Sequence, residues 1–448
     1  MIFTNKKIFI LGMARSGYEA AKVLSRYNNN ILLYDDNKQQ DEAHIKELQA
    51  LGVNLIFEGQ PDDILTSEYD YIIKNPGVPL DHKYVKMAEQ YNIPIINEVE
   101  MAYHLFPKDI TIIGITGTNG KTTTTTLIYE MLKRAGWPVH LTGNIGFPLC
   151  GFIDKVKSKD IIVMEVSIQQ LVNLNDFNAH IVVMTNLFEA HTDFVGSYDN
   201  YLKIKSKIFK NHTNYDIAIL NKADDTVLEL TKYIKSTKKY FSSREKIEGS
   251  YLLKGAIYYN DEKIINTEDI RITGMHNYEN IMAAIVVAKE YQVNNKIIKE
   301  FLEDFAGVEH RQEFVAKING ITFYNDSKAT NIVATQTALK SFIKPTILIL
   351  GGMERNQNFH DLTDYMTNVK QIVCYGETKN RIKEFASEQK IDCIVVDNLE
   401  EATNVSYKLA NDGDIVLFSP ACASWDQYKS FEERGERFKE YVNKLVKE

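Results

Sequence analysis

The stretch from Gly114 to Thr122 has the sequence Gly-Ile-Thr-Gly-Thr-Asn-Gly-Lys-Thr and lies between an apolar run and a helical pattern. A glycine-rich turn at a helix start directs several backbone N–H groups into one concavity, and the helix dipole favours an anion there. In such loops a lysine reaches the terminal phosphates and the next hydroxyl ligates Mg²⁺. The stretch therefore predicts a nucleoside triphosphate site, with a ligand-free glycine turn as the alternative, since Ile115 replaces the first glycine of the strict P-loop pattern. The expected contacts are Gly117, Thr118, Asn119, Gly120, Lys121, Thr122 and Thr123.

A second glycine-bearing turn, Gly12 to Gly17, follows the apolar run Lys7–Leu11. It matches the dinucleotide fingerprint GxGxxG only if Ala14 replaces the middle glycine. Asp35 and Asp36 follow the next apolar run, where a dinucleotide fold places its ribose-binding acid. This segment alone leaves a nicotinamide-dependent dehydrogenase open, although the phosphate loop downstream disfavours it.

Two further apolar runs end in groups that could bind a metal ion. Ile161–Met164 is followed by Glu165, and Ile181–Asn186 leads to His191. A carboxylate at a strand end beside a phosphate loop is a candidate for binding Mg²⁺ or positioning water. For His191, a structural role is the alternative to binding a metal ion.

The segment 201–210 has helical spacing with one lysine out of place. Its apolar stripe comprises Tyr201, Ile204 and Ile208, flanked by Leu202 and Phe209. Lys203, Lys207 and Lys210 are expected on the far side, in solvent. Lys205 lies inside the stripe, where its stem could snorkel and leave the ammonium at the rim. Alternatively Lys205 is buried with a lowered pKa, so that its neutral amine could react with carbon dioxide to give a carbamate that binds Mg²⁺.

The elements that must position these groups are short β-branched runs, each followed by a turn and a helical pattern. Unbroken apolar runs alternating with helices predict an α/β fold of parallel sheets covered on both faces, with ligands at the carboxyl ends of the strands. Composition shifts near 94–108 and 305–320 predict three domains, at 1–96, 97–306 and 307–448. Asn319-Gly320 predicts a hairpin turn at the start of the third domain.

Composition limits the class of protein. The chain has 448 residues, 44% of them hydrophobic and 25% charged, which is ordinary for a globular protein. A net charge of −8 argues against nucleic-acid partners, and no apolar run approaches the length of a membrane span. Residues 1–7 lack the layout of a signal peptide, and the four scattered cysteines predict reduced thiols without a zinc site. A cytoplasmic enzyme is expected, with a nucleotide-dependent switch as the alternative from another class.

Taken together, the motifs resemble those of the Mur ligases, the ATP-dependent amino-acid-adding enzymes of peptidoglycan synthesis. The motifs that carry this resemblance are Gly114–Thr122, Gly143–Gly146, Glu165, Asn186–His191, Lys205, Gly274–Asn280 and His310-Arg311. Asn325–Asn331 and Ser419–Gln427 resemble the members that add D-glutamate to UDP-N-acetylmuramoyl-L-alanine. Another Mur ligase or a folylpolyglutamate synthase-like amide ligase is the alternative.

The resemblance implies Rossmann-like first and third domains around a central P-loop-type ATPase domain with a mostly parallel sheet. It implies a monomer that uses ATP and two Mg²⁺ ions and has no nucleic-acid or membrane partner. The implied catalytic residues are Lys121, Glu165, His191 and carbamylated Lys205, and the metal ligands are Thr122, Glu165, His191 and Lys205. Further ATP contacts are Asn277, Asn280, Arg311 and Asp326. The UDP-sugar residues are Arg15, Ser16, Asp35, Asp36, Asn75, Gly77, Asn144 and Ser167, and the D-glutamate residues are Lys328, Thr330, Arg355, Ser424 and Phe431.

The sequence departs from the family pattern at two places. Ile168-Gln169 stands where the family often has Ser-Phe, and Met353–Asn356 differs from the glycine-rich form of that loop.

Overall fold

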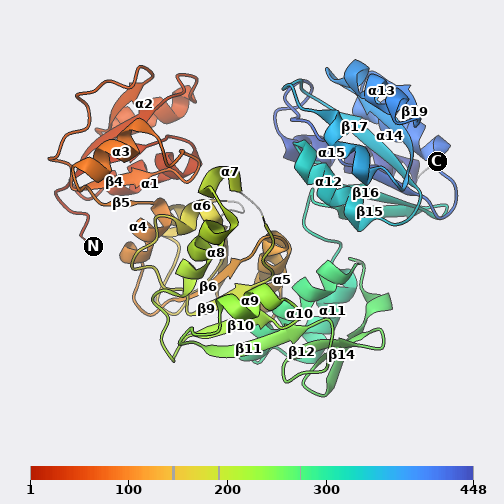
Figure 1. Ribbon diagram of the computed structural model, residues 1–448, viewed down its shortest axis with the longest axis horizontal. Coiled ribbons are helices and arrows are strands. Elements are labelled where there is room, and N and C mark those ends of the chain that lie inside the picture. The colour runs from red at the N-terminus through yellow and green to blue at the C-terminus, as the bar shows by residue number, and fades with distance from the viewer. Residues whose placement is uncertain (1, 144–146, 190–191, 273, 447–448) are drawn as a thin grey trace. The chain divides into compact units, whose positions relative to one another are not determined.

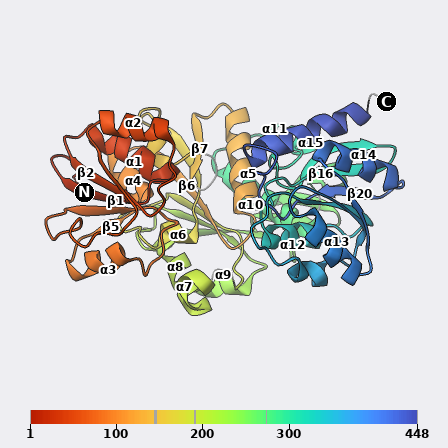
Figure 2. The ribbon, with the colours of Figure 1, turned by 90° about the horizontal axis from the view of Figure 1, so that it is seen from above.

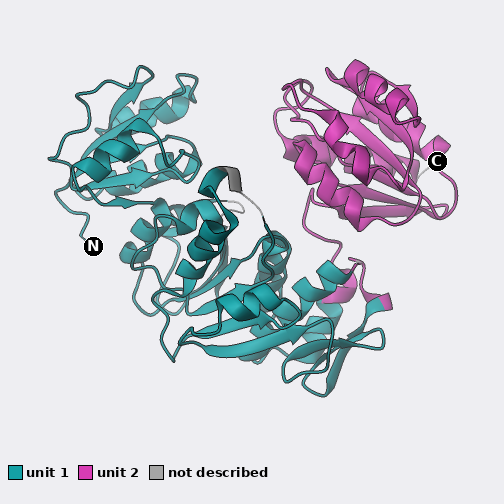
Figure 3. Cartoon of the chain, viewed as in Figure 1, with its two compact units in different colours: residues 1–267, 275–301 teal, residues 268–274, 302–448 magenta. Residues whose placement is uncertain are grey.

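Three β-sheets organise the chain in a computed structural model that describes residues 2–143, 147–189, 192–272 and 274–446 (Figure 1). The chain divides into two compact units, one of residues 1–267 and 275–301 and one of residues 268–274 and 302–448 (Figure 3). The predicted domain boundaries at 96/97 and 306/307 stay predictions. Among the described residues, no helix combines the length and apolarity needed to cross a bilayer.

The first sheet is five-stranded and parallel, in the order β3-β2-β1-β4-β5. Its strands are β1 Lys7–Leu11, β2 Asn30–Asp35, β3 Asn54–Phe57, β4 Tyr71–Lys74 and β5 Ile95–Ile96. Helices α1 (Arg15–Ser25) and α2 (Glu42–Ala50) cover one face, and α3 (Lys83–Gln90) covers the other (Figure 2). The apolar strands are therefore buried on both faces, as their unbroken β-branched sequences predict.

The central sheet has nine strands in the order β14-β13-β12-β11-β10-β9-β6-β8-β7. The strands are β6 Thr111–Thr116, β7 Val139–Gly143, β8 Ile161–Glu165, β9 Ile181–Met184, β10 Ile217–Asn221, β11 Thr237–Ser242, β12 Ser250–Leu253, β13 Ala256–Tyr259 and β14 Glu262–Asn266. The helices of this part are α4 Glu98–Leu105, α5 Lys121–Arg134, α6 Ile168–Leu171, α7 Thr192–Val195, α8 Tyr198–Ser206, α9 Asp225–Leu230, α10 Met275–Glu290 and α11 Asn295–Asp304. All pairings are parallel except β12–β13 and β13–β14, so the predicted mostly parallel sheet is confirmed.

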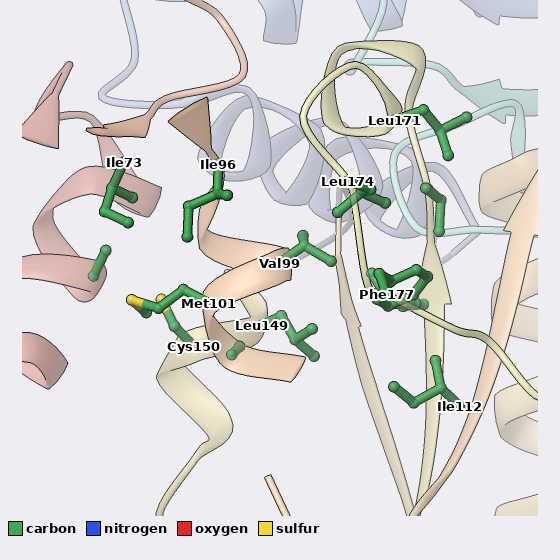
Figure 4. Close-up of a cluster of buried hydrophobic side chains, with 14 of the residues drawn as sticks. Ile73, Ile96, Val99, Met101, Ile112, Leu149, Cys150, Leu171, Leu174 and Phe177 are labelled. Carbon is green, nitrogen blue, oxygen red and sulfur yellow. The ribbon is translucent and has the colours of Figure 1, made fainter. Parts of the chain in front are cut away.

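One hydrophobic core joins the first sheet to the central sheet. Ile73 and Ile96 of the first sheet, Val99 and Met101 of α4, and Ile112 of β6 all belong to it (Figure 4). The buried carboxylate of Glu98 in α4 also accepts a 3.0 Å hydrogen bond from the backbone N–H of Cys150. Helix α4 thus packs in the core that both sheets share and is hydrogen-bonded to the segment between β7 and β8.

The second unit contains a six-stranded sheet in the order β15-β16-β20-β17-β18-β19. Its strands are β15 Glu313–Ile318, β16 Ile321–Asn325, β17 Thr346–Gly351, β18 Val369–Tyr375, β19 Asp392–Val395 and β20 Ile415–Phe418. The helices are α12 Ile332–Ser341, α13 Lys379–Glu388, α14 Leu399–Leu409 and α15 Phe431–Leu445. β15 and β16 form the predicted hairpin, in which Asn319 and Gly320 both have positive φ, as a type I′ turn requires.

Candidate functional site

The predicted phosphate loop connects β6 to α5 in a conformation that depends on its glycines. Gly117 has φ +141° and Gly120, the residue before the first helical turn, has φ +80°. A Cβ on Gly117 would overlap Thr185 Oγ1, and one on Gly120 would overlap Asn280 Oδ1. The backbone therefore approaches two neighbouring elements too closely for any other residue. The loop leads into the N-terminus of α5, where the helix dipole favours an anion.

Asn186, which follows β9, stabilises this loop from the side. Its Oδ1 accepts a 2.9 Å hydrogen bond from Asn119 N–H, and its carbonyl accepts one of 2.9 Å from Thr118 N–H. The Lys121 ammonium turns back onto the loop and donates to the carbonyls of Gly117, at 3.2 Å, and Thr118, at 2.8 Å. The lysine therefore lies against the predicted phosphate loop. Thr123, on the first turn of α5, is half-buried.

Thr122 and Glu165 meet beneath the loop, where two hard oxygen donors could hold a cation. Thr122 Oγ1 donates a 2.7 Å hydrogen bond to Glu165 Oε2, and both side chains are buried. They meet because Ile115 of β6 pairs with Glu165 at the end of β8. A buried carboxylate and a hydroxyl beside a phosphate loop are the donor types that Mg²⁺ prefers, so these residues fit the ion. The predicted ligand His191 lies outside the described residues.

Lys205 lies under the same loop, on α8. Only 1% of the side chain is exposed, so the snorkelling interpretation is wrong. Its Nζ donates to Thr116 Oγ1 and to the carbonyl of Gly117, both at 3.0 Å. Thr116 in turn donates to the carbonyl of Val166 at 3.0 Å, which fixes its hydroxyl as an acceptor for the lysine.

The surroundings of Lys205 favour the neutral amine. Burial lowers its pKa well below the ordinary value, the nearby Lys121 ammonium lowers it further, and Glu165 opposes the shift in part. Among the described residues, none of the ion pairs includes Lys205. Two acceptors match the two hydrogens of a neutral amine, and such an amine keeps the lone pair that attacks carbon dioxide.

One expectation about the segment 201–210 needs correction. Lys207 is expected in solvent, but it lies in the 3₁₀ turn after α8, is half-buried and donates a 2.8 Å hydrogen bond to the carbonyl of Val172. Ile204, expected in the apolar stripe, is half-buried and packs against the hydrophobic core. Lys203 and Lys210 are exposed as predicted.

Helix α10 contributes Asn280 to the loop and carries Asn277 one turn earlier. Asn280 is buried, and its Oδ1 accepts a 3.2 Å hydrogen bond from Thr124 of α5. Asn277 is half-buried. The structure therefore brings Asn280 against the phosphate loop, as the family motif implies.

The proposed UDP-sugar residues gather at the carboxyl ends of β1, β2 and β4. Asn75 Nδ2 donates to Ser16 Oγ at 2.8 Å, and Asn75 Oδ1 accepts from Gly77 N–H at 3.0 Å. Asp35 Oδ2 accepts from Met13 N–H at 2.6 Å. This edge includes the switch point of the sheet, between β1 and β4, where doubly wound folds bind ligands.

Other residues assigned to the sugar nucleotide are placed differently. Asp36 turns toward Tyr34, Gln60 and His82, with contacts of 2.7 to 2.9 Å. Arg15 is exposed at the start of α1. Ser167 forms a capping box with Gln170 at the start of α6, so the buried Ile168 of the Ile168-Gln169 departure lies in a regular helical turn. Asn144 lies outside the described residues.

In the second unit, the proposed nucleotide residue Asp326 is buried at the end of β16. Ser419 donates a 2.7 Å hydrogen bond to its Oδ2, and Gln312 N–H donates one of 3.1 Å to its Oδ1. Burial raises the pKa of Asp326 to about 7, although these two bonds and the charge of Arg311 act in the opposite direction. Arg311 is exposed.

The proposed D-glutamate residues lie at the carboxyl edge of the third sheet, in loops and, for Phe431, at the start of α15. The Lys328 ammonium lies 5.7 Å from the centre of the Phe431 ring, and the Phe431 carbonyl accepts a 2.8 Å hydrogen bond from Ser327. Ser424 is buried in the loop after β20, and Thr330 is half-buried two residues after Lys328. Because β20 lies between β16 and β17, these loops are neighbours.

Arg355 follows β17 in the loop that departs from the family pattern. Its exposed guanidinium lies over the exposed Trp425 ring, 5.6 Å from the ring centre. Met353 N–H donates to the carbonyl of Ala423 at 2.9 Å, so this loop pairs with the loop that carries Ser424. The structure therefore places a second cation at the same sheet edge as Lys328.

Sequence reasoning missed Arg434, a fully buried guanidinium on α15. It donates to the Ser327 hydroxyl at 3.1 Å, the Ser327 carbonyl at 2.9 Å and the Cys422 carbonyl at 3.0 Å. These bonds fasten the loops after β16 and β20. The sequence contains a pattern that could have indicated the burial of Arg434. Helical spacing relates Arg434 to the apolar residues Phe431, Phe438, Val442 and Leu445, so Arg434 interrupts an apolar stripe as Lys205 does.

The fold and these sites agree with the comparisons with known proteins. Residues 115–288 match the Mur ligase middle domain and residues 310–422 match the Mur ligase, glutamate ligase domain. The chain belongs to the Mur ligase family. A relative from Geobacillus sp. (strain WCH70), named UDP-N-acetylmuramoylalanine–D-glutamate ligase, is 43% identical over 99% of this chain and 98% of its own length. One of the same name from Bacillus cereus (strain AH187) is 42% identical over 99% of each chain.

Solved structures share the fold at low identity. UDP-N-acetylmuramate-alanine ligase MurC from Thermotoga maritima aligns with TM-score 0.58 and 18% identity, covering 98% of this chain and all of that chain. MurF from Acinetobacter baumannii aligns with TM-score 0.57 and 18% identity, covering 98% of this chain and 93% of that chain. These similarities support the α/β fold with mostly parallel strands that the sequence predicts.

Proposed function

We propose that this protein is the ligase that adds D-glutamate to UDP-N-acetylmuramoyl-L-alanine with ATP, as the names of its full-length relatives indicate. The observation that carries the proposal is the buried group of Thr122, Glu165 and Lys205 beneath a phosphate loop. The reaction is a step of peptidoglycan precursor synthesis. Because it consumes ATP, it would take place in the cytoplasm. Domains at 1–96, 97–306 and 307–448 would serve the UDP-sugar, ATP and the amino acid in turn.

The chemistry follows from the poor reactivity of a carboxylate toward an amine. An oxygen of the muramoyl-alanine carboxylate attacks the γ-phosphorus of ATP, the bond to the bridging oxygen breaks, and ADP leaves. The amine of D-glutamate then attacks the carbonyl carbon of the acyl phosphate, phosphate leaves with the transferred oxygen, and the nitrogen loses a proton. Because acyl phosphates hydrolyse, the site must exclude water during both steps.

The residues of the first unit divide the work on ATP. The N–H groups at the start of α5 and the Lys121 ammonium would hold the phosphates. Thr122, Glu165, His191 and carbamylated Lys205 would hold two Mg²⁺ ions, which when bound neutralise charge on the γ-phosphate. Carbamylation converts Lys205 from a group that repels a cation into an anionic ligand, which its neutral buried amine makes feasible. Asn277 and Asn280 of α10 would complete the nucleotide site on this unit, and Arg311 and Asp326 would be the nucleotide contacts of the second unit.

Two cations of the second unit would recognise the amino acid. Glutamate carries two carboxylates, and Lys328 and Arg355 both lie at the carboxyl edge of the third sheet. Charge-assisted hydrogen bonds from these cations would orient both carboxylates, with Thr330, Ser424 and Phe431 beside them. The UDP portion would lie at the edge formed by Ser16, Asp35, Asn75 and Gly77.

Release of ADP tests this function against its alternatives. We expect turnover with UDP-N-acetylmuramoyl-L-alanine and D-glutamate, and none with L-glutamate or meso-diaminopimelate. Turnover with meso-diaminopimelate would indicate another Mur ligase. ADP release that ignores every amino acid would indicate a nucleotide switch and overturn the proposal.

The assignment of two separate sites has its own test. Lys121→Ala removes the ammonium at the phosphate loop, so ATP turnover should be lost while calorimetric titration still detects the sugar nucleotide. Lys133→Ala, on the exposed side of the same helix, is the matched control and should retain both. Loss of sugar-nucleotide binding in Lys121→Ala alone would contradict the division.

A further inference from the structure

Two cysteine thiols are in contact on neighbouring strands of the third sheet. Cys374 Sγ and Cys393 Sγ are 3.4 Å apart, one on β18 and the other on the edge strand β19. Both side chains lie on the face covered by α13, where Cys374 is part of the hydrophobic core and Cys393 is packed against it. Neither residue belongs to the machinery proposed above.

The two thiols differ in exposure and in acidity. Cys374 is buried, whereas Cys393 is partly exposed. The hydrogen bond from Cys374 and the charge of Lys383 on α13 lower the pKa of Cys393, although burial acts against them. The same bond and burial raise the pKa of Cys374. Cys393 therefore has the thiolate character of an attacking sulfur, with a protonated partner in contact with it.

We propose that Cys374 and Cys393 form a site of reversible oxidation, at which hydrogen peroxide converts the two thiols into a disulfide. The Cys393 thiolate attacks one peroxide oxygen, the O–O bond breaks, and hydroxide leaves, which gives a sulfenic acid on Cys393. The Cys374 sulfur then attacks the Cys393 sulfur, the S–O bond breaks, and water leaves as the S–S bond forms. In sum, two thiols lose two protons and two electrons, and one hydrogen peroxide takes them up and becomes two waters.

The register of β18 and β19 indicates that a disulfide between these cysteines would be strained and readily reduced. Ile372 pairs with Cys393, and Cys374 pairs with Val395, so the cysteines are diagonal neighbours two residues apart along the sheet. Diagonal neighbours on a sheet have Cα atoms roughly 7–8 Å apart, which is more than a relaxed disulfide spans. Bringing the sulfurs from 3.4 Å to about 2 Å therefore draws the carboxyl end of β18 toward β19. Strained, partly exposed disulfides are readily reduced, and in reducing compartments such bonds are transient.

The strand end that must move is attached to the loops of the proposed amino-acid site. The residues after Cys374 contact two of these loops: Thr378 donates to the carbonyl of Gly352 at 3.2 Å, and Glu377 N–H donates to Asp426 at 3.3 Å. Gly352 begins the loop that carries Arg355, and Asp426 follows Ser424. We therefore expect oxidation to weaken the binding of D-glutamate and so to slow turnover. This consequence rests on the proposed function.

Mass spectrometry of the full-length protein tests the oxidation itself. After brief treatment with hydrogen peroxide, we expect a mass loss of two hydrogens, a peptide linking Cys374 to Cys393, and recovery of both thiols with dithiothreitol. Cys393→Ser and Cys374→Ser should each abolish the linked peptide, whereas Cys150→Ser, which removes a buried thiol of the other unit, should leave it. Addition of two or three oxygens to Cys393 without a linked peptide, or no reaction, would overturn the proposal.

Activity then tests the consequence separately from the linkage. We expect the oxidised wild type to lose most of its D-glutamate-dependent ADP release, with a raised KM for D-glutamate, and to recover with dithiothreitol. Cys393→Ser should keep its activity in peroxide. A fully linked protein with unchanged kinetics would refute the coupling to the loops, and an inactive reduced protein would instead refute the proposed function.

Discussion

The hydroxyl of Thr122 and the carboxylate of Glu165 share a 2.7 Å hydrogen bond at the buried base of the phosphate loop. The bond joins the first turn of α5 to the end of β8, through two residues that are 43 positions apart in the chain. Lys205 reaches the same loop from α8, through Thr116 and Gly117. Three elements therefore deliver the groups that the proposed chemistry needs to one place.

Removing the Thr122 hydroxyl should lower the affinity of the site for Mg²⁺. Thr122→Val keeps the shape of the side chain but loses the donor, so the Mg²⁺ concentration for half-maximal turnover should rise by about tenfold, or roughly 1.4 kcal/mol. Thr126→Val, one turn further along α5, loses only a hydrogen bond to the Thr122 carbonyl and is the matched control. Equal magnesium dependence in both variants would argue against Thr122 as a ligand.

Lys205→Arg should reduce turnover by at least about 100-fold, because a guanidinium cannot form the carbamate and the stabilisation of transition-state charge is lost. Lys203→Arg makes the same change on the exposed side of α8 and should be neutral. The modification has a readout that does not depend on activity. Protein equilibrated with ¹³C-bicarbonate should show a carbamate carbon signal in wild type that Lys205→Arg lacks, and its absence from wild type would end the carbamate proposal.

Gly120→Ala should destabilise the protein through two effects that a control can separate. Both Gly120 and Gly136 have left-handed backbone conformations, at φ +80° and +85°, so alanine at either site costs roughly 1 kcal/mol. At Gly136 the space is open, whereas at Gly120 the added carbon overlaps Asn280. Denaturant unfolding should show the larger loss for Gly120→Ala, and equal losses would mean that the loop and α10 are not in close contact.

Because its pKa is raised, Asp326 should lower the free energy of unfolding as pH rises. Its folded pKa of about 7 lies above the ordinary value of 3.8, so between these values the unfolded state has released the proton that the folded state still holds. This group's contribution is fully present below about pH 4 and is lost as pH rises to 7, by at most about 4 kcal/mol. Unfolding curves of wild type and Asp326→Asn from pH 4 to 8 should diverge in favour of the variant, and parallel curves would contradict the shift.

Much of the first unit could be predicted from local sequence. Unbroken apolar runs place Glu165 at a strand end beside the phosphate loop, because parallel strands align their carboxyl ends at one edge. The position of Lys205 in an apolar stripe indicated burial as one of two interpretations, and only its contacts with Thr116 and Gly117 decide between them.

The remainder depends on contacts between residues far apart in the chain. The half-burial of Lys207 follows from its bond to Val172, 35 residues away, which no local periodicity encodes. Arg434 meets Ser327 across 107 residues, so its bonds to two loops appear only in the folded sheet. The contact of Cys374 with Cys393 likewise depends on the register of β18 and β19.

Oxygen isotope transfer tests the account most directly. UDP-N-acetylmuramoyl-L-alanine with both carboxylate oxygens replaced by ¹⁸O would be incubated with ATP, Mg²⁺ and D-glutamate, and the released phosphate analysed by mass spectrometry. The proposed acyl phosphate predicts one ¹⁸O in each phosphate and one in the new amide. Phosphate that contains only oxygen from ATP and water would show that ATP is hydrolysed without activation of the carboxylate, and would contradict the ligase.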